Sequence, residues 1–300
     1  IVESDSGDEI VANVSFSASL GIVISVCSSF TVKTNGFELN SAECGLSEPL
    51  GRVINGDITW RPQVPWLVYI FTASQRGKGT PCGGSIITRN VIMTAAHCVK
   101  TRDRIARVVV YYNTTRLQDD NYIDVESAVV HPKYRNLDSG YNIALLKLSR
   151  PIDRYDRFVR PVCLPWQGKR IRAGQMLIAG YGAVNMQNKP SDHIFYYMAN
   201  VLSERSCSLA MAHQWKRIKA KVWNLFMCTK NLYQTAYTGD SGDPVTAVSG
   251  GRSVQYGIVT FGQTQNRGPA PVMHTKVSMF IDWINDSLDR IDRWKRLKHP

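Results

Sequence analysis

The sequence lacks any hydrophobic run long enough to cross a membrane. No stretch of about 18 or more uninterrupted apolar residues occurs, whereas a membrane-spanning helix needs about 20. A basic leader is missing too, because the chain starts at Ile1 and its opening positions carry Glu3, Asp5 and Asp8. We therefore expect no membrane span, and a chain that is already processed or is a fragment.

Closely spaced cysteine and histidine ligands of the zinc type are also absent, although the chain has 7 cysteines. Disulfide bonds are the better interpretation, and they indicate an oxidising compartment. Asn-x-Ser/Thr triplets at Asn13, Asn113 and Asn285 permit glycosylation and add weak support for secretion. The sequence thus predicts an extracellular protein with no metal and no cofactor.

Acidic residues are scarce after Arg52. Residues 1–52 hold seven acidic and two basic residues, a net charge of −5, while the rest holds 34 basic and 17 acidic residues, a net charge of +17. From Asn13 to Val32 polar and apolar residues alternate as in β-strands, and Cys27 has no obvious partner. We interpret residues 1–43 as the end of an upstream regulatory module or as a propeptide.

Short apolar runs punctuated by glycine and proline follow Arg52. Strands of this length at regular spacing favour an all-β sandwich or a pair of barrels. The runs cover residues 66–71, 84–87, 91–94, 107–112, 143–148, 176–179 and 256–261. Near the end, Phe280, Ile284, Leu288 and Ile291 recur every three or four residues, which predicts a helix with one apolar face.

Four short motifs occur in this order along the chain: RVING at 52–56, TAAHC at 94–98, IALLKL at 143–148 and GDSGDP at 239–244. A histidine beside a cysteine is by itself more often structural than catalytic. Together, however, the motifs make the chain resemble the trypsin-like serine proteases from about Cys44 to Leu288. The resemblance implies two packed antiparallel β-barrels, chymotrypsin-like, with a C-terminal helix and the active site at their junction. It divides the chain into a disulfide-tethered activation segment (44–52), a protease domain (53–288) and a basic tail (289–300).

The resemblance assigns two members of a catalytic triad directly. Ser241 matches the nucleophile and His97 the general base, which a serine hydroxyl needs because it is protonated near neutral pH. The backbone amides of Gly239 and Ser241 match the oxyanion hole, and Gly239 suits the turn because it has no Cβ.

The third member departs from the family pattern, since Asn142 stands where the family has aspartate. Aspartate accepts the proton on the far imidazole nitrogen and stabilises the imidazolium, whereas an amide lacks the charge and favours the wrong tautomer. In trypsin-like serine proteases this substitution lowers kcat by a factor of roughly 10⁴. That factor corresponds to an activation free energy higher by on the order of 5 kcal/mol. Asp138 is a conceivable substitute if its loop turns inward.

Asp243 is a second departure, because the family has glycine two residues after the nucleophile. An aspartate here brings a charge near the site. Two interpretations stay open: Asp243 perturbs His97 electrostatically, or it points to solvent.

The resemblance also implies activation by cleavage. Arg52 followed by Val53 matches the activation site, and the freed α-amino group of Val53 would pair with Asp240, since a buried carboxylate needs a partner. Arginine at the scissile position implies an upstream activating protease of tryptic specificity. The implied disulfides are Cys44 with Cys163, Cys82 with Cys98, and Cys207 with Cys228.

The specificity pocket implied by the family is lined by Thr235, Thr260, Gly262 and Val272. Thr235 stands where trypsin-type enzymes place an aspartate for Lys/Arg substrates, and Val272 replaces a glycine and narrows the cavity. Tryptic cleavage is therefore not expected; a small apolar residue, or nothing, would be accepted.

Basic residues gather in three clusters and raise a polyanion hypothesis, either heparin-like glycans or microbial polymers. The alternative is an ordinary solvated surface. The clusters are Arg154, Arg157 and Arg160; Lys216, Arg217, Lys219 and Lys221; and Arg290, Arg293, Lys295, Arg296 and Lys298.

These observations predict a secreted protease homologue of an extracellular cascade, with catalysis much reduced by Asn142 and a role as cofactor or regulator of a partner protease. Two alternatives remain: an active endopeptidase of small-apolar specificity acting on a protein substrate, and a non-catalytic glycan-binding module.

Overall fold

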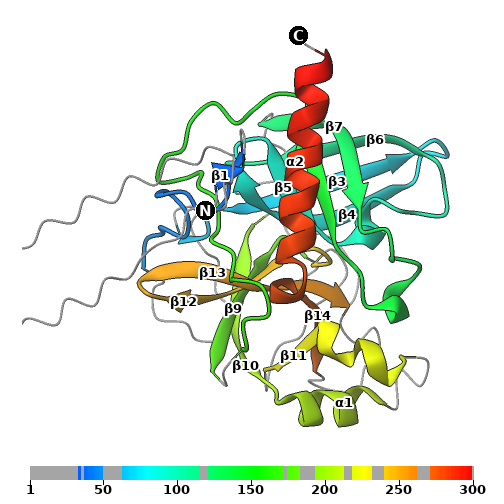
Figure 1. The fold of residues 1–300 in the computed structure, drawn as a ribbon, viewed down its shortest axis with the longest axis vertical. Coiled ribbons are helices and arrows are strands. Elements are labelled where there is room, and N and C mark those ends of the chain that lie inside the picture. The colour runs from blue at the N-terminus through cyan, green and yellow to red at the C-terminus, as the bar shows by residue number, and fades with distance from the viewer. Residues whose placement is uncertain are drawn as a thin grey trace, which may run out of the picture. The chain divides into compact units, whose positions relative to one another are not determined.

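The structure is a computed structural model. It describes residues 33–34, 37–49, 63–114, 121–171, 174–182, 193–212, 218–231, 240–261 and 271–298. Two closed antiparallel barrels of six strands each dominate this part of the chain (Figure 1). The predicted all-β, two-barrel fold with a C-terminal helix is therefore confirmed.

The first barrel has the strand order β3-β4-β5-β8-β7-β6. Its strands are β3 (Leu67–Ser74), β4 (Gly79–Thr88), β5 (Val91–Thr94), β6 (Ile105–Tyr111), β7 (Tyr122–Val130) and β8 (Ala144–Leu148). Every residue of β5 is buried, and so is every residue of β8 but Lys147. Strands covered on both faces read as continuous apolar runs, which is why these two stood out in the sequence.

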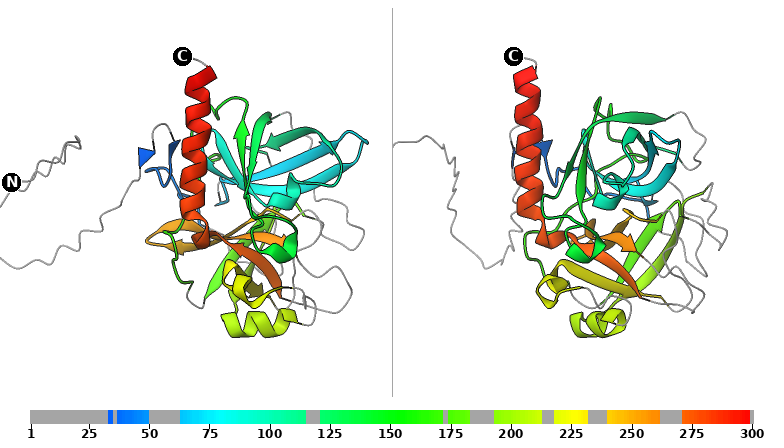
Figure 2. Two further views of the ribbon diagram at one scale, coloured as in Figure 1. Left: turned by 45° about the vertical axis from the view of Figure 1, so that its right-hand side comes forward. Right: turned by 90° about the vertical axis from the view of Figure 1, so that its right-hand side faces the viewer.

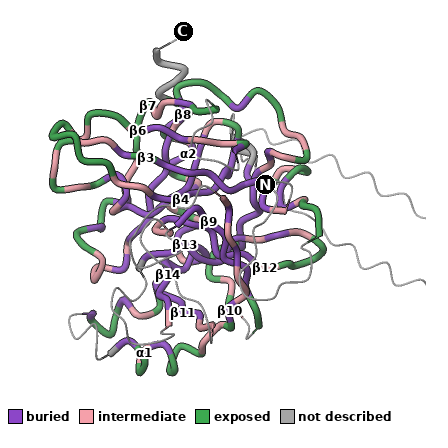
Figure 3. The backbone as a smooth tube through the Cα atoms, turned by 180° about the vertical axis from the view of Figure 1, so that it is seen from behind, coloured by how far each residue is buried: buried purple, intermediate pink, exposed green. Residues whose placement is uncertain are grey.

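The second barrel has the strand order β10-β11-β14-β13-β12-β9. Its strands are β9 (Gln175–Gly180), β10 (Phe195–Val201), β11 (Phe226–Lys230), β12 (Pro244–Ser249), β13 (Arg252–Phe261) and β14 (Val272–Lys276). A separate two-stranded sheet pairs β1 (Lys33–Thr34) with β2 (Phe37–Glu38). Figure 3 shows that the buried stretches follow the barrel strands, while exposed stretches lie mainly in the connections.

The helices are few and short, apart from the last one. They are the 3-10 turns η2 (Ala96–Cys98), η3 (Leu137–Ser139), η4 (Ala220–Leu225) and η5 (Val277–Met279), and the α-helices α1 (Glu204–Ala212) and α2 (Ile281–Lys298). None of the helices in the described ranges is long and apolar enough to span a membrane.

Helix α2 lies along the first barrel (Figures 1 and 2). The four apolar residues that predicted it are at most 5% exposed, so the predicted face is the one that packs. The helix continues to Lys298, through the segment expected as a basic tail. The apolar stripe is therefore what attaches this terminal segment to the barrel.

Three disulfides cross-link the protease fold, with the partners that the resemblance implied. Cys44–Cys163 joins residues 119 positions apart, Cys82–Cys98 joins β4 to η2, and Cys207–Cys228 joins α1 to β11. Cys27 lies outside the described residues, as do the predicted strands of residues 13–32.

The packing of α2 leads to a stability prediction. Leu288 is 0% exposed, so Leu288→Ala should lower the free energy of unfolding by about 2–5 kcal/mol, through lost burial and the cavity left behind. The exposed residue Asp286 on the same helix supplies the control, since Asp286→Ala should change stability by no more than about 0.5 kcal/mol. Urea unfolding of both variants measures this, and equal effects would contradict the packing described for α2.

Candidate active site

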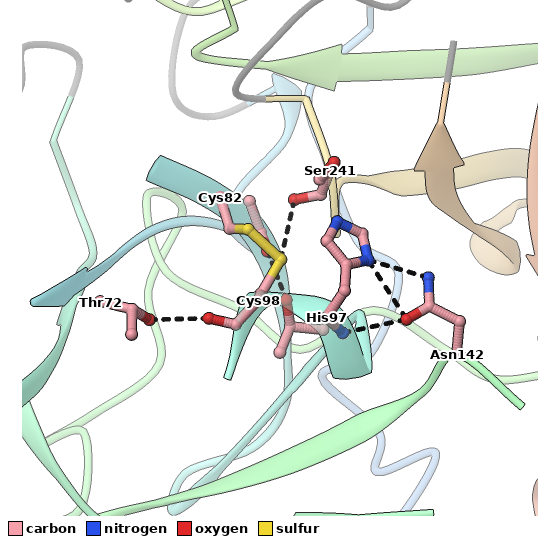
Figure 4. The surroundings of a disulfide bond; sticks show 8 residues. Thr72, Cys82, His97, Cys98, Asn142 and Ser241 are labelled. Carbon is pink, nitrogen blue, oxygen red and sulfur yellow. Dashed lines mark hydrogen bonds between the residues drawn. A yellow bond between two sulfur atoms is a disulfide. The ribbon is translucent and has the colours of Figure 1, made fainter. Parts of the chain in front are cut away.

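His97 lies in the 3-10 turn η2, directly after the buried strand β5. Its neighbours Ala96 and Cys98 are fully buried, and the Cys82–Cys98 disulfide ties the turn to β4. The hydroxyl of Thr72 donates a hydrogen bond of 2.9 Å to the carbonyl of Cys98 (Figure 4). The histidine backbone is thus fixed from both sides by the first barrel.

Asn142 lies just before β8 and is 0% exposed. Beside it, Tyr141 stacks on His131 at 4.8 Å between ring centroids, and His131 also contacts Trp283 of α2. From the second barrel, the hydroxyl of Thr275 donates a 3.1 Å hydrogen bond to the carbonyl of Asn142. Both barrels and the C-terminal helix therefore position this residue.

The side chains of His97 and Asn142 meet directly (Figure 4). The backbone N–H of His97 donates to Oδ1 of Asn142 at 3.0 Å. Nδ1 of the imidazole lies 3.2 Å from that oxygen and 3.0 Å from Nδ2 of the same amide. The backbone donor fixes which end of the amide is oxygen, and both that oxygen and the NH₂ group lie within hydrogen-bond distance of Nδ1.

The contact with the amide of Asn142 affects which nitrogen of His97 carries the proton. If Nδ1 accepts a hydrogen bond from the amide, the ring proton is on Nε2, and Nε2 then has no lone pair to take a proton from serine. Burial lowers the pKa of His97 below 6.5, and the hydrogen bond with Asn142 offsets this only in part. The contact between His97 and the third triad position is present, whereas the charge that would stabilise an imidazolium is not.

Ser241 occupies the turn between the barrels, on the side of His97 away from Asn142 (Figure 4). Its carbonyl accepts a 2.8 Å hydrogen bond from the backbone of Gly83 on β4, and Gly242 donates to Val259 on β13 at 2.8 Å. Gly242 has φ +92° and its Cα lies so close to Gly83 that a Cβ would overlap the Gly83 carbonyl. Among the hydrogen bonds of the described residues, none joins Ser241 to His97.

Asp243 does not point to solvent, because its residue is 0% exposed. The solvent interpretation is therefore wrong. Burial, and then the charge of Asp240, raise the pKa of Asp243 well above 3.8. The electrostatic interpretation, in which Asp243 perturbs His97, stays a prediction.

Only part of the predicted specificity pocket can be described. Val272 is 2% exposed and packs in an apolar cluster with Met176 and Val259, so its side chain fills the barrel core. Thr260 is 1% exposed and shares a 2.9 Å hydrogen bond with Thr275. Thr235, Gly262, the oxyanion residue Gly239, and the activation residues Arg52 and Val53 lie outside the described residues.

Asp138 lies in η3, and one of its side-chain oxygens is buried without a hydrogen-bond partner. The side-chain hydrogen bonds described for His97 all go to Asn142. Asp138 thus makes no described contact that would substitute for the missing carboxylate.

A metal site at this position is chemically unfavourable. The ligand atoms of Cys82, His97 and Cys98 lie within 4.8 Å of one another. Both sulfurs are, however, joined in a disulfide, whereas a metal binds the thiolate.

A cavity of about 700 Å³ lies away from the triad residues. The 45–49 segment, Arg157 and Arg160 line it together with β12, and His97, Asn142 and Ser241 do not. It is therefore no substitute for the specificity pocket.

Thr275 and the pair His131–Tyr141 were not predicted as site residues. A threonine in a strand and aromatic residues before a motif carry no sequence signal of their own, because their roles arise from pairing across barrels.

Comparison with known proteins gives the family. The sequence model of the Trypsin family matches residues 53–284. The chain belongs to the trypsin family of serine proteases. The family range begins at Val53, the residue after the predicted cleavage position.

Several curated relatives are similar over most of this trypsin-family chain. Phenoloxidase-activating factor 3 of Holotrichia diomphalia is 30% identical over 88% of this chain and 80% of the relative. CLIP domain-containing serine protease B4 of Anopheles gambiae is 29% identical over 83% of this chain and 73% of the relative.

Solved structures share the fold. HL collagenase has a TM-score of 0.66 at 22% identity, covering 79% of this chain and 98% of that one. The structure titled GrC has a TM-score of 0.65 at 25% identity, covering 79% and 99%.

The contact between His97 and Asn142 can be tested by titration. Asn142→Asp should raise the pKa of His97, because a carboxylate beside Nδ1 stabilises the imidazolium. NMR titration of the ring measures the pKa, and the ¹⁵N shifts report which nitrogen carries the proton. Asn136→Asp, at an exposed loop position, is the control. A His97 pKa that does not respond to Asn142→Asp would contradict the described contact.

Proposed function

We propose that this trypsin-family protein is a secreted cascade component whose catalysis is much reduced by Asn142. The observation that carries the proposal is the buried amide of Asn142, whose Nδ2 lies 3.0 Å from Nδ1 of His97. An amide fills the space and the hydrogen-bonding role of an aspartate but supplies no negative charge. The role that remains is that of a cofactor or regulator of a partner protease.

The names of the relatives support a cascade setting. They are phenoloxidase-activating factors and a CLIP domain-containing protease from insects. By this likeness, the chain acts outside the cell, is cut at Arg52–Val53 by an upstream protease of tryptic specificity, and joins a cascade of the phenoloxidase-activating type. After the cut, the α-amino group of Val53 pairs with Asp240.

An active endopeptidase with small-apolar specificity is the second candidate. The backbone hydrogen bonds that position Ser241 favour it, and so does the ring of His97, which lies between Ser241 and Asn142.

Fewer unpaired basic side chains are available for glycan binding than the sequence indicated. Arg157 lies 3.6 Å from Glu48, and Arg160 lies 3.8 Å from Glu43, so both are ion-paired at the surface. Lys219, Lys221, Arg290 and Arg293 are exposed. Polyanion binding is therefore kept as an additional property and not as the leading function.

Cleavage is tested by treating the purified protein with trypsin in limiting amount. The new chain should begin Val53-Ile54-Asn55-Gly56, and the two pieces should separate on gels only with reductant, because Cys44 is bonded to Cys163. The variant Arg52→Gln should resist this cut. A first residue other than Val53, or separation without reductant, would count against the proposal.

Catalysis is tested by restoring the carboxylate. In the cleaved protein, Asn142→Asp should raise turnover of a small ester by roughly 10² to 10⁴, since the charged triad member is regained. The ester should carry a small apolar residue before the scissile bond. The double variant Asn142→Asp, Ser241→Ala should lose the gain, which assigns it to the nucleophile. If Asn142→Asp stays inert after cleavage, the reduced activity has another cause, and Asp243, two residues after Ser241, becomes the first suspect.

A further inference from the structure

Four neighbouring strands of the first barrel, β4, β3, β6 and β7, share one outward face (Figure 1). Successive side chains of a barrel strand point alternately inward and outward. Across these strands the row Cys82–Ile70–Val110–Ile123 points inward, since each of its members is at most 2% exposed. The residues before and after these positions therefore lie on the outward face.

This outward face is largely aromatic and apolar. Its two adjacent rows are Pro81–Phe71–Val109 and Tyr69–Tyr111–Tyr122. The ring centroids of Tyr69 and Tyr111 lie 5.8 Å apart, as do those of Tyr111 and Tyr122. Phe71 is 37% exposed and Tyr122 is 39% exposed, so the group reaches solvent at two places. Single exposed apolar residues are ordinary, whereas an apolar patch rimmed by polar residues is typical of a binding surface.

Basic side chains rim this face where β3 turns into β4 and where β6 begins. The backbone N–H of Gln75 donates to the carbonyl of Arg104 at 2.9 Å, and Ala73 pairs with Arg107, so the two segments are adjacent. Their basic residues are all exposed, and they are Arg76, Lys78, Arg102, Arg104 and Arg107. These residues come from two separate stretches of sequence, which is why no cluster in the sequence revealed them. We call them, together with the two rows, the β3–β6 face.

Only part of this positive charge is paired. Nε and Nη2 of Arg107 donate to the carboxylate of Asp124 at 2.6 and 3.0 Å, and Arg76 lies 3.1 Å from Asp103. The guanidinium of Arg107 also lies 5.4 Å from the ring centroid of Tyr122, so the charged rim meets the aromatic rows. Within the described ranges, no carboxylate forms an ion pair with the remaining three, Lys78, Arg102 and Arg104.

We propose that the β3–β6 face binds an extended segment of a partner protein in which an apolar side chain is flanked by aspartate or glutamate. The carboxylates of that segment pair with Lys78 and Arg104, and its apolar side chain packs on Phe71. Charge complementarity of this kind selects the partner and speeds association, while aromatic anchors supply much of the affinity.

The aromatic rows favour a peptide over a sulfated glycan as the ligand. A glycan would use the cations and leave the exposed ring of Phe71 without a contact, whereas the peptide uses both parts of the face. The triad residues lie outside this face. Partner recognition there adds to the proposed cascade role and depends neither on catalysis nor on cleavage at Arg52.

Binding is tested with the full chain carrying Arg52→Gln, so that cleavage does not intervene. The probe is a short labelled peptide with one phenylalanine between two runs of glutamate, and fluorescence anisotropy measures its Kd. Lys78→Glu and Arg104→Glu should each raise this Kd by about tenfold or more, because a repulsion replaces an attraction. Lys221→Glu, the same charge reversal at an exposed position of η4, should change it by less than about twofold, since salt screens charges outside the contact.

The aromatic contribution is measured separately. Phe71→Ser should raise the Kd of the phenylalanine peptide by about tenfold, because it removes the anchoring ring. It should leave the Kd of a peptide of glutamate alone unchanged. Tyr122→Ser, which removes the other exposed ring, should act in the same direction and serves as the second variant if Phe71→Ser loses stability.

Three results would overturn the proposal. The first is no binding of the phenylalanine peptide at low ionic strength. The second is an equal effect of Lys221→Glu and Arg104→Glu, which would show attraction by net charge alone. The third is equal binding of heparin and both peptides with no response to Phe71→Ser and Tyr122→Ser, which would assign the face to polyanions. None of these results bears on whether Asn142 limits turnover.

Discussion

Hydrogen bonding across the junction of the two barrels is the constraint on which this structure depends. Polar groups in that seam are shielded from water, and most of them are therefore hydrogen-bonded. Ser85 of β4 donates to Gln255 of β13 at 2.6 Å, Gly83 donates to Ser241, and Thr275 donates to Asn142. The candidate active site lies at this junction, and residues of both barrels position Asn142 and Ser241.

The constraint explains how an asparagine fits where the family has aspartate. Folding asks only that the group at this position be of the right shape and hydrogen-bonded, and an amide meets both demands. Catalysis asks in addition for negative charge beside the imidazole, which an amide lacks. A carboxylate meets both requirements, whereas Asn142 meets only the first, so the fold around His97 is retained without the negative charge.

Asp243 is the second departure from the family pattern, and here an acidic side chain stands where the family has glycine. The space comes from Gly83 and Gly180, and burial raises the pKa of the carboxyl. The position two residues after Ser241 thus accepts an aspartate because the two strands that face it carry glycine.

The sequence by itself determined the strands, the helix face and the family motifs. Apolar runs such as 91–94 and 143–148 marked β5 and β8, and the spacing of Phe280 to Ile291 marked α2, because burial on one or two faces leaves a periodic trace. Resemblance in the motifs then placed His97, Asn142 and Ser241 and the three disulfides. Only the tertiary structure decided that Asp243 is buried, that Thr275 holds Asn142, and that the backbone N–H of His97 donates to the amide oxygen of Asn142. These depend on contacts between residues about 45 to 160 positions apart, and no local pattern records the environment that a fold creates around a single side chain.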